Sequence, residues 1–174
     1  IGMAISWPWL LPPAFLDASK QGVLNIHAGL LPHYRGNACS NWAILNDEPE
    51  LGYTIHFMDS VLDSGPIVVK RKIKNDGLCR VGDVMTFMES DGPDQLVRLA
   101  KIAARGELLP SSAQRHSLAR YRFPRGPSDN EINWTWSSDY IFRHYRSLGD
   151  PYPNPFTHYL GDRIEILSME HPRN

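Results

Sequence analysis

The stretch Val23-Leu24-Asn25-Ile26-His27 organises the predicted fold of this chain. Its apolar residues are typical of a short buried strand, and the segment Gly29-Leu30-Leu31-Pro32 then turns the chain. Residues two apart in a strand point the same way, so Asn25 and His27 are expected to face one side together. A lone histidine on a strand is usually structural, but an amide beside an imidazole at a strand end indicates a site for proton transfer.

Asp63 is the third predicted member of this site. It lies in the loop 59–65 between two strand-like runs, 51–58 and 66–73, which we expect to form a hairpin. A carboxylate, an imidazole and an amide in one cleft can move protons at a carbonyl carbon. His56 stays open between two interpretations, a buried hydrogen-bonded histidine and a residue that supports the site.

Length and composition are ordinary for one globular domain with a core. The chain has 174 residues, of which 42% are hydrophobic and 21% are charged. A net charge of -1 does not indicate a broad nucleic-acid or membrane surface. No apolar run approaches the roughly 18 residues needed to span a bilayer, so no membrane partner is expected.

Cysteine and histidine spacing gives no metal or disulfide motif. Cys39 and Cys79 form neither a disulfide framework nor a zinc spacing, so a reducing, cytoplasmic setting is expected. The histidines have no metal-ligand spacing, and no metal site is predicted. The chain starts at Ile1, and 1–6 is typical of the end of a buried strand, so we expect an amino-terminal portion to be absent.

The remaining elements are predicted from hydrophobic periodicity and from turn residues. We expect a last strand over 163–169 and helices over 13–20, 38–46, 81–105 with a break at Gly92-Pro93, and 137–148 capped by Ser137 or Ser138. The run Trp7-Pro8-Trp9-Leu10-Leu11-Pro12 cannot be regular because of its two prolines. It is either a hydrophobic plug over the core or a slot whose free backbone groups recognise a flat heterocycle.

Several motifs together carry a family resemblance. They are Leu24-Asn25-Ile26-His27-Ala28-Gly29-Leu30-Leu31-Pro32-His33-Tyr34-Arg35-Gly36, Trp42-Ala43-Ile44-Leu45-Asn46, Gly52-Tyr53-Thr54-Ile55-His56 and Leu62-Asp63-Ser64-Gly65. This series resembles the 10-formyltetrahydrofolate-dependent formyltransferase family. Tyr121-Arg122-Phe123-Pro124-Arg125, Glu131-Ile132-Asn133-Trp134 and Pro151-Tyr152-Pro153 are similar to the region after the catalytic domain in the methionyl-tRNA and sugar-nucleotide branches. Gly29 departs from the pattern, since that position is commonly Ser.

The resemblance implies an α/β fold, a Rossmann-like formyltransferase catalytic domain with a mixed sheet flanked by helices and a small C-terminal extension. The domain would be partial, with its first strands before Ile1. The implied division is 1–110 for the C-terminal part of the catalytic domain, 111–136 for a linker and 137–174 for the start of a small C-terminal subdomain.

The resemblance also implies a folate site and a mechanism. Trp7, Trp9, Leu10 and Leu11 would form the loop that holds the pterin of 10-formyltetrahydrofolate, with Met58 and Asp63 lining the other side. Asn25 and protonated His27 would donate hydrogen bonds to the oxyanion that forms as an amine attacks the formyl carbon. A water held by Asp63, or His27 if it starts neutral, would take the proton from the amine. Asp63 would favour the imidazolium form of His27.

The acceptor amine is expected to belong to a nucleotide-linked sugar. Arg122 and Arg125 are then expected to meet a diphosphate, and Trp134, Tyr152 or Phe156 to stack on a base. Packing of the tail on the domain is the commoner role for such aromatics. Aminoacyl-tRNA, as in methionyl-tRNA formyltransferase, is the alternative acceptor. A non-catalytic folate-binding or interaction module is the alternative of another class, and a homodimer is left open.

Overall fold

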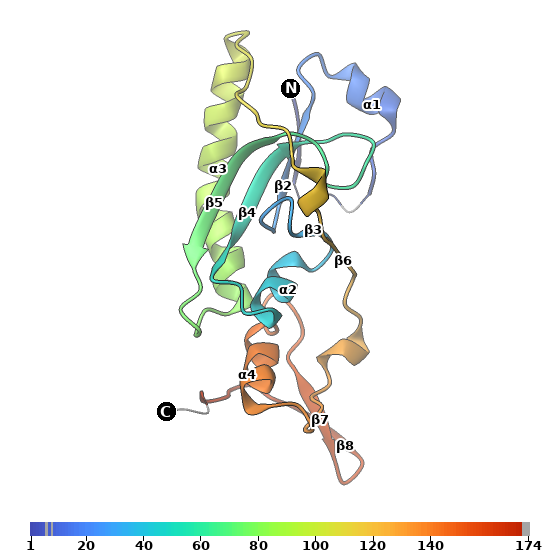
Figure 1. Cartoon of the computed structure of the whole chain (residues 1–174), viewed down its shortest axis with the longest axis vertical. Coiled ribbons are helices and arrows are strands. Elements are labelled where there is room, and N and C mark those ends of the chain that lie inside the picture. Colours follow the sequence, from blue (N-terminus) through green and yellow to red (C-terminus); the bar gives the residue numbers. More distant parts are fainter. Residues whose placement is uncertain (6, 8, 172–174) are drawn as a thin grey trace.

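The computed structural model describes residues 1–5, 7 and 9–171. Its main sheet has the strand order β1-β2-β4-β5, in which β1 and β2 are parallel and the other pairs are antiparallel (Figure 1). The strands of this sheet are β1 (Gly2–Ile5), β2 (Val23–His27), β4 (Glu50–Phe57) and β5 (Ile67–Lys74). The helices are α1 (Pro13–Ala18), α2 (Cys39–Leu45), α3 (Val81–Ala104) and α4 (Ser138–Arg146). The α/β class with a mixed sheet is confirmed.

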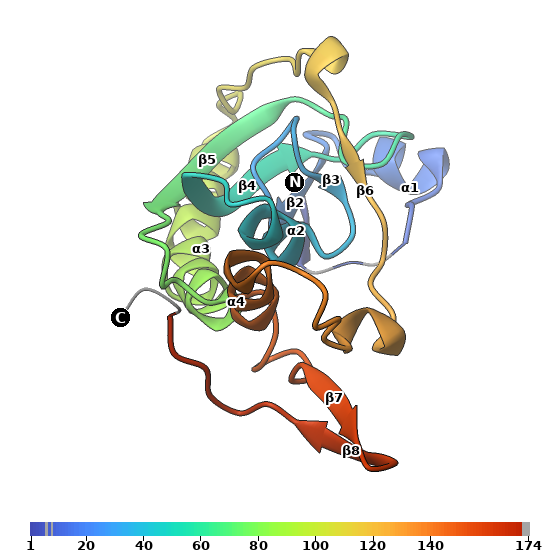
Figure 2. The ribbon, with the colours of Figure 1, turned by 60° about the horizontal axis from the view of Figure 1, so that its bottom comes forward.

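The core lies between the sheet and α3, which runs along one face of it (Figures 1 and 2). Leu24 and Ile26 of β2 pack there with Tyr53 and Ile55 of β4 against Leu96 of α3. Side chains alternate along a strand, so Asn25 and His27 of β2 and His56 of β4 are turned to the opposite side. The apolar side chains of β2 therefore hold the strand on the core, and its polar side chains on the other face are free to form a site.

The expectation of a buried first strand is wrong. Met3 and Ile5 are 39% and 64% exposed. The reason is that β1 is an edge strand, with only β2 hydrogen-bonded beside it. Residue 6, the predicted end of this strand, lies outside the described residues. Residues 7 and 9–12 form no helix or strand, in line with the irregular loop that their prolines predict.

The predicted break at Gly92-Pro93 is also wrong, because α3 is continuous from Val81 to Ala104. Gly92 lies directly on the sheet, where an added Cβ would come within 2.6 Å of the Ile26 Cδ1. Burial of Leu96 and Leu99 beyond the proline keeps the second half of α3 on the core. Packing therefore outweighs the helix-breaking tendency of Pro93.

The C-terminal part forms α4 and a small hairpin of β7 (Phe156–Tyr159) and β8 (Asp162–Glu165). Ser137 caps α4 by accepting a hydrogen bond from the Tyr140 N–H, as predicted. β7 was not predicted, because the prolines just before it favoured an irregular segment. The Asn41 Nδ2 donates to the Ser147 carbonyl at 2.7 Å and joins α4 to α2.

Two further short strands, β3 (Arg35–Gly36) and β6 (Tyr121–Arg122), pair in parallel. Through this pair the segment that follows α3 returns along the end of β2 and then reaches α4 (Figure 1). Across the residues that the structure describes, no helix is both long and apolar enough to cross a membrane.

Replacing Pro93 with Ala is expected to stabilise the protein by about 1–3 kcal/mol, because it restores a helical N–H and removes the ring clash inside α3. Urea unfolding followed by circular dichroism measures the change. Pro13→Ala is the matched control, since Pro13 stands in the first turn of α1, where no helical N–H is lost. Equal stability of Pro93→Ala and wild type would show that α3 carries no strain at this position.

Candidate active site

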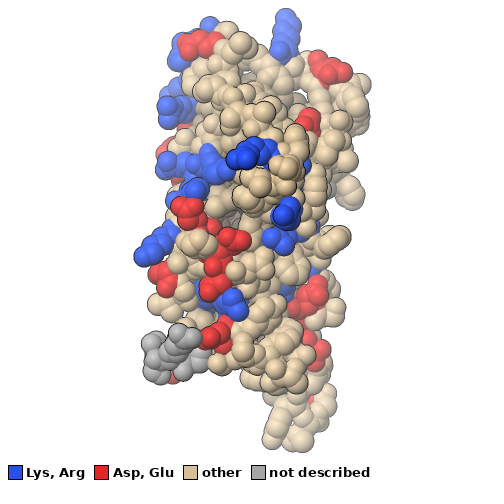
Figure 3. Space-filling view, in the orientation of Figure 1, with Lys and Arg blue, Asp and Glu red and all other residues tan. Residues whose placement is uncertain are grey.

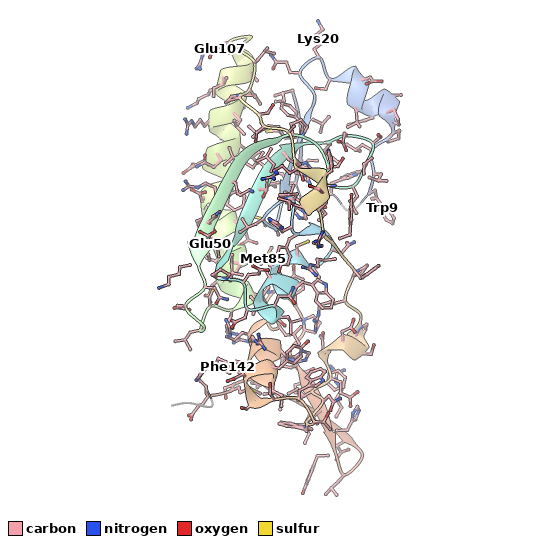
Figure 4. The ribbon with its side chains drawn as sticks, in the orientation of Figure 1. Trp9, Lys20, Glu50, Met85, Glu107 and Phe142 are labelled. Atoms are coloured by element: carbon pink, nitrogen blue, oxygen red, sulfur yellow. The ribbon has the colours of Figure 1, made fainter. Side chains whose placement is uncertain are left out.

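A cavity of about 570 Å³ opens at the end of β2. Its polar wall contains Asn25, His27 and Asp63, which are each only 8% exposed. Trp7, Trp9 and Leu10 form the outer wall, while Met85 and Met88 of α3 form the inner one. Figure 4 shows Trp9 at the outer edge of the molecule and Met85 near its centre. The predicted convergence of the amide, the imidazole and the carboxylate is therefore present.

His27 uses its two ring nitrogens differently. The Nε2 lies 2.7 Å from the Tyr34 carbonyl oxygen, so this nitrogen carries the proton of the neutral ring and donates it there. The Nδ1 lies 3.5 Å from the Asp63 Oδ2. A Cβ at position 29 would stand 2.8 Å from both the His27 Nε2 and the Tyr34 oxygen. Because Gly29 has no Cβ, it leaves room for the hydrogen bond between these two atoms. The Nδ1 is therefore the ring nitrogen that is free to accept a proton.

Asp63 is held from three sides. Its Oδ2 accepts a hydrogen bond from the Gly36 N–H at 2.8 Å, and its Oδ1 lies 3.5 Å from the His56 Nε2. His56 donates from its Nδ1 to the Phe57 carbonyl at 2.7 Å. Of the two open interpretations of His56, the structure thus favours a residue that contacts the site.

Asn25 lies between His56 and the cavity. Its Nδ2 is 3.4 Å from the His56 Nε2, and its buried Oδ1 has no hydrogen-bond partner among the described residues. A buried amide oxygen without a partner is costly, which points to a ligand or to a turned amide at this position.

Burial and charge act against each other on the two titratable groups. Burial lowers the pKa of His27 below its ordinary value of 6.5, and the Asp63 charge and the Tyr34 carbonyl offset this only in part. Burial raises the pKa of Asp63, but the hydrogen bond with His56, the charge of His27 and the Gly36 N–H outweigh burial and hold this pKa below its usual range. The site therefore pairs an anionic Asp63 with a neutral His27, although the sequence analysis stressed the imidazolium.

The predicted folate residues fall into two groups. Trp7, Trp9 and Leu10 line the cavity with Asp63. The structure does not bring Leu11 or Met58 to its wall. Leu11 is buried, and the Met58 backbone continues β4 by donating its N–H to the Val23 carbonyl at 2.7 Å.

Two predicted acceptor residues, Arg125 and Tyr152, line a second cavity of about 510 Å³. Tyr152 and Asn37 line both cavities, so the two spaces are neighbours. Arg122 lines neither, because its guanidinium stacks over the Tyr34 ring at 4.6 Å. Arg163, which was not predicted, lines the second cavity.

Met85, Met88 and Asn37 were missed as wall residues. The two methionines have helical spacing in the predicted helix 81–105, but the same spacing is typical of core packing. Asn37 directly follows Gly36, the last residue of the first quoted motif, and this position was the available signal. Among the described residues, no group of three or more His, Cys, Asp or Glu side chains is placed to hold a metal ion.

Comparison with known proteins finds two family models that match this chain. Residues 3–92 match the family described as formyl transferase, and residues 126–174 match the formyl transferase C-terminal domain. A methionyl-tRNA formyltransferase from Carboxydothermus hydrogenoformans is 36% identical over 90% of this chain and 50% of its own length. The chain spans about half the length of the curated relatives it matches.

Solved structures share the fold. A 4-N formyltransferase from Francisella tularensis has a TM-score of 0.80 at 21% identity, over 97% of this chain and 70% of that one. An N-formyltransferase from Helicobacter canadensis, solved with folinic acid and dTDP-3-aminofucose, has a TM-score of 0.66 at 23% identity, over 77% of this chain and 51% of that one. The first family model alone spans more than half of the sequence and contains Asn25, His27 and Asp63. The chain belongs to the formyl transferase family.

Proposed function

We propose that this chain transfers a formyl group from 10-formyltetrahydrofolate to a primary amine. The observation that carries the proposal is the meeting of Asn25, His27 and Asp63 in one cavity with an aromatic outer wall. The residues that line the cavity are chemically suited to a folate. Trp7 and Trp9 offer flat surfaces to a pterin, and the unpartnered Asn25 amide oxygen marks a polar ligand position. The folate supplies the formyl carbon, and the residues of the chain handle charge and protons.

His27 takes the proton of the attacking amine at its Nδ1, because its Nε2 is engaged with the Tyr34 carbonyl. Asp63, 3.5 Å away, stabilises the imidazolium that results. The charged ring then donates to the formyl oxygen, which gains negative charge as the amine adds, and can return its proton to the departing nitrogen. A water held by Asp63 is the alternative acceptor of the first proton.

Asn25 supplies the other donor to the formyl oxygen. The Asn25 Nδ2 carries two hydrogens, and one faces the His56 Nε2 at 3.4 Å, which can accept it because the His56 Nδ1 donates to the Phe57 carbonyl. The second Nδ2 hydrogen is the one assigned to the formyl oxygen. One such preorganised donor is worth about 3 kcal/mol of barrier.

The second cavity supports a small anionic acceptor, and we propose an amino sugar linked to a nucleotide. Arg125 and Arg163 line this space, and Tyr152 borders both cavities. A phosphate group between the two arginines would leave the sugar amine near Tyr152 and the mouth of the first cavity. The bound dTDP-3-aminofucose of the Helicobacter canadensis relative is a ligand of this chemistry.

Initiator methionyl-tRNA is the second candidate acceptor, favoured by the curated relatives, which are methionyl-tRNA formyltransferases. The net charge of -1 weighs against it, since tRNA binding usually needs an excess of basic residues. On the face shown in Figure 3, acidic and basic side chains are interspersed.

The deciding experiment mixes the chain with 10-formyltetrahydrofolate and either a dTDP-linked amino sugar or methionyl-tRNA, and follows the appearance of tetrahydrofolate. Release with one amine identifies the acceptor class. Folate binding without release in the presence of any amine would favour the non-catalytic module, and absence of folate binding would refute both.

Asn25→Ala is expected to reduce turnover by about 10²–10³-fold, because it removes an oxyanion donor, while folate affinity changes by about threefold or less. Steady-state kinetics and folate titration measure the two effects. Asn46→Ala is the control, since Asn46 donates to the Tyr34 hydroxyl outside the cavity. Near-normal turnover in the Asn25 variant would reject its role.

The pKa of His27 is expected below 6.5, and Asp63→Asn should lower it further, because the carboxylate charge that favours the imidazolium is lost. Transfer through neutral His27 then falls as the pH drops through this pKa. NMR titration of labelled histidine rings in the ligand-free chain measures the pKa, with Asp17→Asn as an exposed control. A higher His27 pKa in Asp63→Asn would contradict the proposed pairing.

Arg125→Gln is expected to raise the KM of a nucleotide-linked amino sugar about tenfold, since a charge-assisted contact to phosphate is lost, with the folate KM unchanged. Arg120→Gln is the matched control, because Arg120 is exposed in the same segment and donates to the Ala119 carbonyl. An acceptor KM that is equal in the two variants would place the phosphate elsewhere.

A further inference from the structure

Gln114 is a buried amide in the segment 111–136, which the sequence analysis treated as a linker. It lies between the two regions that the family models match, 3–92 and 126–174. The structure places this segment against the site, because Ser112 and Ile67 exchange two backbone hydrogen bonds of 2.8 Å at the start of β5. Gln114 follows two residues later and reaches the loop that carries Asp63.

The Gln114 side chain uses both ends of its amide. Its Nε2 donates to the Asp63 carbonyl at 2.8 Å and to the Gly65 carbonyl at 2.7 Å. Its Oε1 accepts from the Arg35 Nε at 3.1 Å and from the Arg35 Nη2 at 2.8 Å. The amide therefore joins the loop to β3 through four hydrogen bonds, which leaves none of its donors or its acceptor unused.

Arg35 holds the Gln114 amide in place through its two hydrogen bonds to the Oε1. Its side chain is almost fully buried, and it also donates to the Tyr121 hydroxyl at 3.0 Å. The next residue, Gly36, donates its backbone N–H to the Asp63 Oδ2. The Arg35–Gly36 pair thus fixes the carboxylate directly and, through Gln114, the backbone from which the carboxylate projects.

Asp63 needs such support because its backbone has a φ of 51°, in the left-handed region that favours glycine. A non-glycine residue keeps this conformation only where its surroundings determine it. The two Gln114 hydrogen bonds hold this stretch of backbone, since they end on the Asp63 carbonyl and on that of Gly65. The direction of the carboxylate toward His27 depends on the same backbone.

We propose that Gln114, held by Arg35, is a positioning residue that fixes the Asp63 carboxylate beside His27. The inference rests on the proposed function, since it assigns what places one of the three polar groups. With this role for Gln114, the segment 111–136 contributes to the active site, although no side chain between 93 and 125 lines the first cavity.

The test is Gln114→Glu, which keeps the side-chain shape and the acceptor for Arg35, whose guanidinium balances the added charge. The variant replaces the donor to the two carbonyls with an oxygen that repels them. The loop is released, and the Asp63 charge moves away from His27. His56 of β4 and Cys39 of α2 are the other titratable groups near His27, whereas the Gln114 amide bonds to Asp63, Gly65 and Arg35. The Arg35 Nη2 also lies 3.2 Å from the His116 Nδ1. The pKa of His27, measured by NMR in the ligand-free chain, should therefore fall toward its value in Asp63→Asn.

Formyl transfer in Gln114→Glu should decrease about tenfold in kcat, with the folate KM changed by about threefold or less. Gln21→Glu is the matched control, because Gln21 also donates from its Nε2 to a carbonyl, that of Ala103, at 3.3 Å and away from the cavity. The control should keep the wild-type His27 pKa and kcat. A folded Gln114→Glu protein with the wild-type His27 pKa would overturn the proposal.

Arg35→Lys keeps the test valid if Gln114→Glu does not fold. Lysine retains the charge but cannot make both hydrogen bonds to the Gln114 Oε1. The His27 pKa should fall in the same direction and by less, and an unchanged value would again refute the positioning role. The NMR measurement needs no turnover, so absence of formyl transfer in wild type would refute the proposed function while the pKa comparison still decides the role of Gln114.

Discussion

The contact between the Asp63 carboxylate and its three partners is the interaction on which the site depends. A buried carboxylate loses the solvation that water gives it, and this loss must be offset by hydrogen bonds and nearby positive charge. The Gly36 N–H of β3 donates directly to the carboxylate, and the imidazoles of His27 on β2 and His56 on β4 each lie 3.5 Å from it. One side chain in a loop thereby connects three elements at the end of the sheet, and each of them is fixed in turn by the core beneath it.

Much of this arrangement could be predicted because it follows from local pattern. Alternation along β2 predicted that Asn25 and His27 share one face, and the loop between the two following strands allowed Asp63 to reach them. The errors came from nonlocal packing. The exposure of β1 depends on what lies beside it in the sheet, and the continuity of α3 across Pro93 depends on the residues that Gly92 meets on β2. Neither fact is encoded within a short window of sequence.

The same limit explains which site residues were found and which were not. Residues named from a local motif, such as Trp7 and Trp9, line the cavity, whereas Met58 continues the ladder of β4 and Arg122 stacks on Tyr34. Gln114 contacts a loop 49 residues earlier in the chain through its hydrogen bond to Gly65, and nothing in its own neighbourhood distinguishes it from an exposed polar residue. Tyr152 borders both cavities because contacts such as that of Asn41 with Ser147 hold the C-terminal helix against α2.

Burial lowers the pKa of His27 and raises the pKa of Asp63, yet only His27 is left neutral. This difference matches the proposed mechanism, in which His27 first accepts a proton beside an ionised Asp63. A desolvated His27 is neutral and can accept a proton, whereas Asp63 stays ionised because its hydrogen bonds exceed the cost of its burial. Once His27 is charged, the nearby carboxylate favours that charge most strongly, at the moment when the formyl oxygen needs a donor. If the carboxylate were farther from the ring, His27 could still accept a proton, but its imidazolium would be less stable and would not stay charged to donate to the formyl oxygen. The 3.5 Å separation of the Nδ1 and the Oδ2 is therefore the quantity that links the geometry of the loop to the chemistry of the cavity.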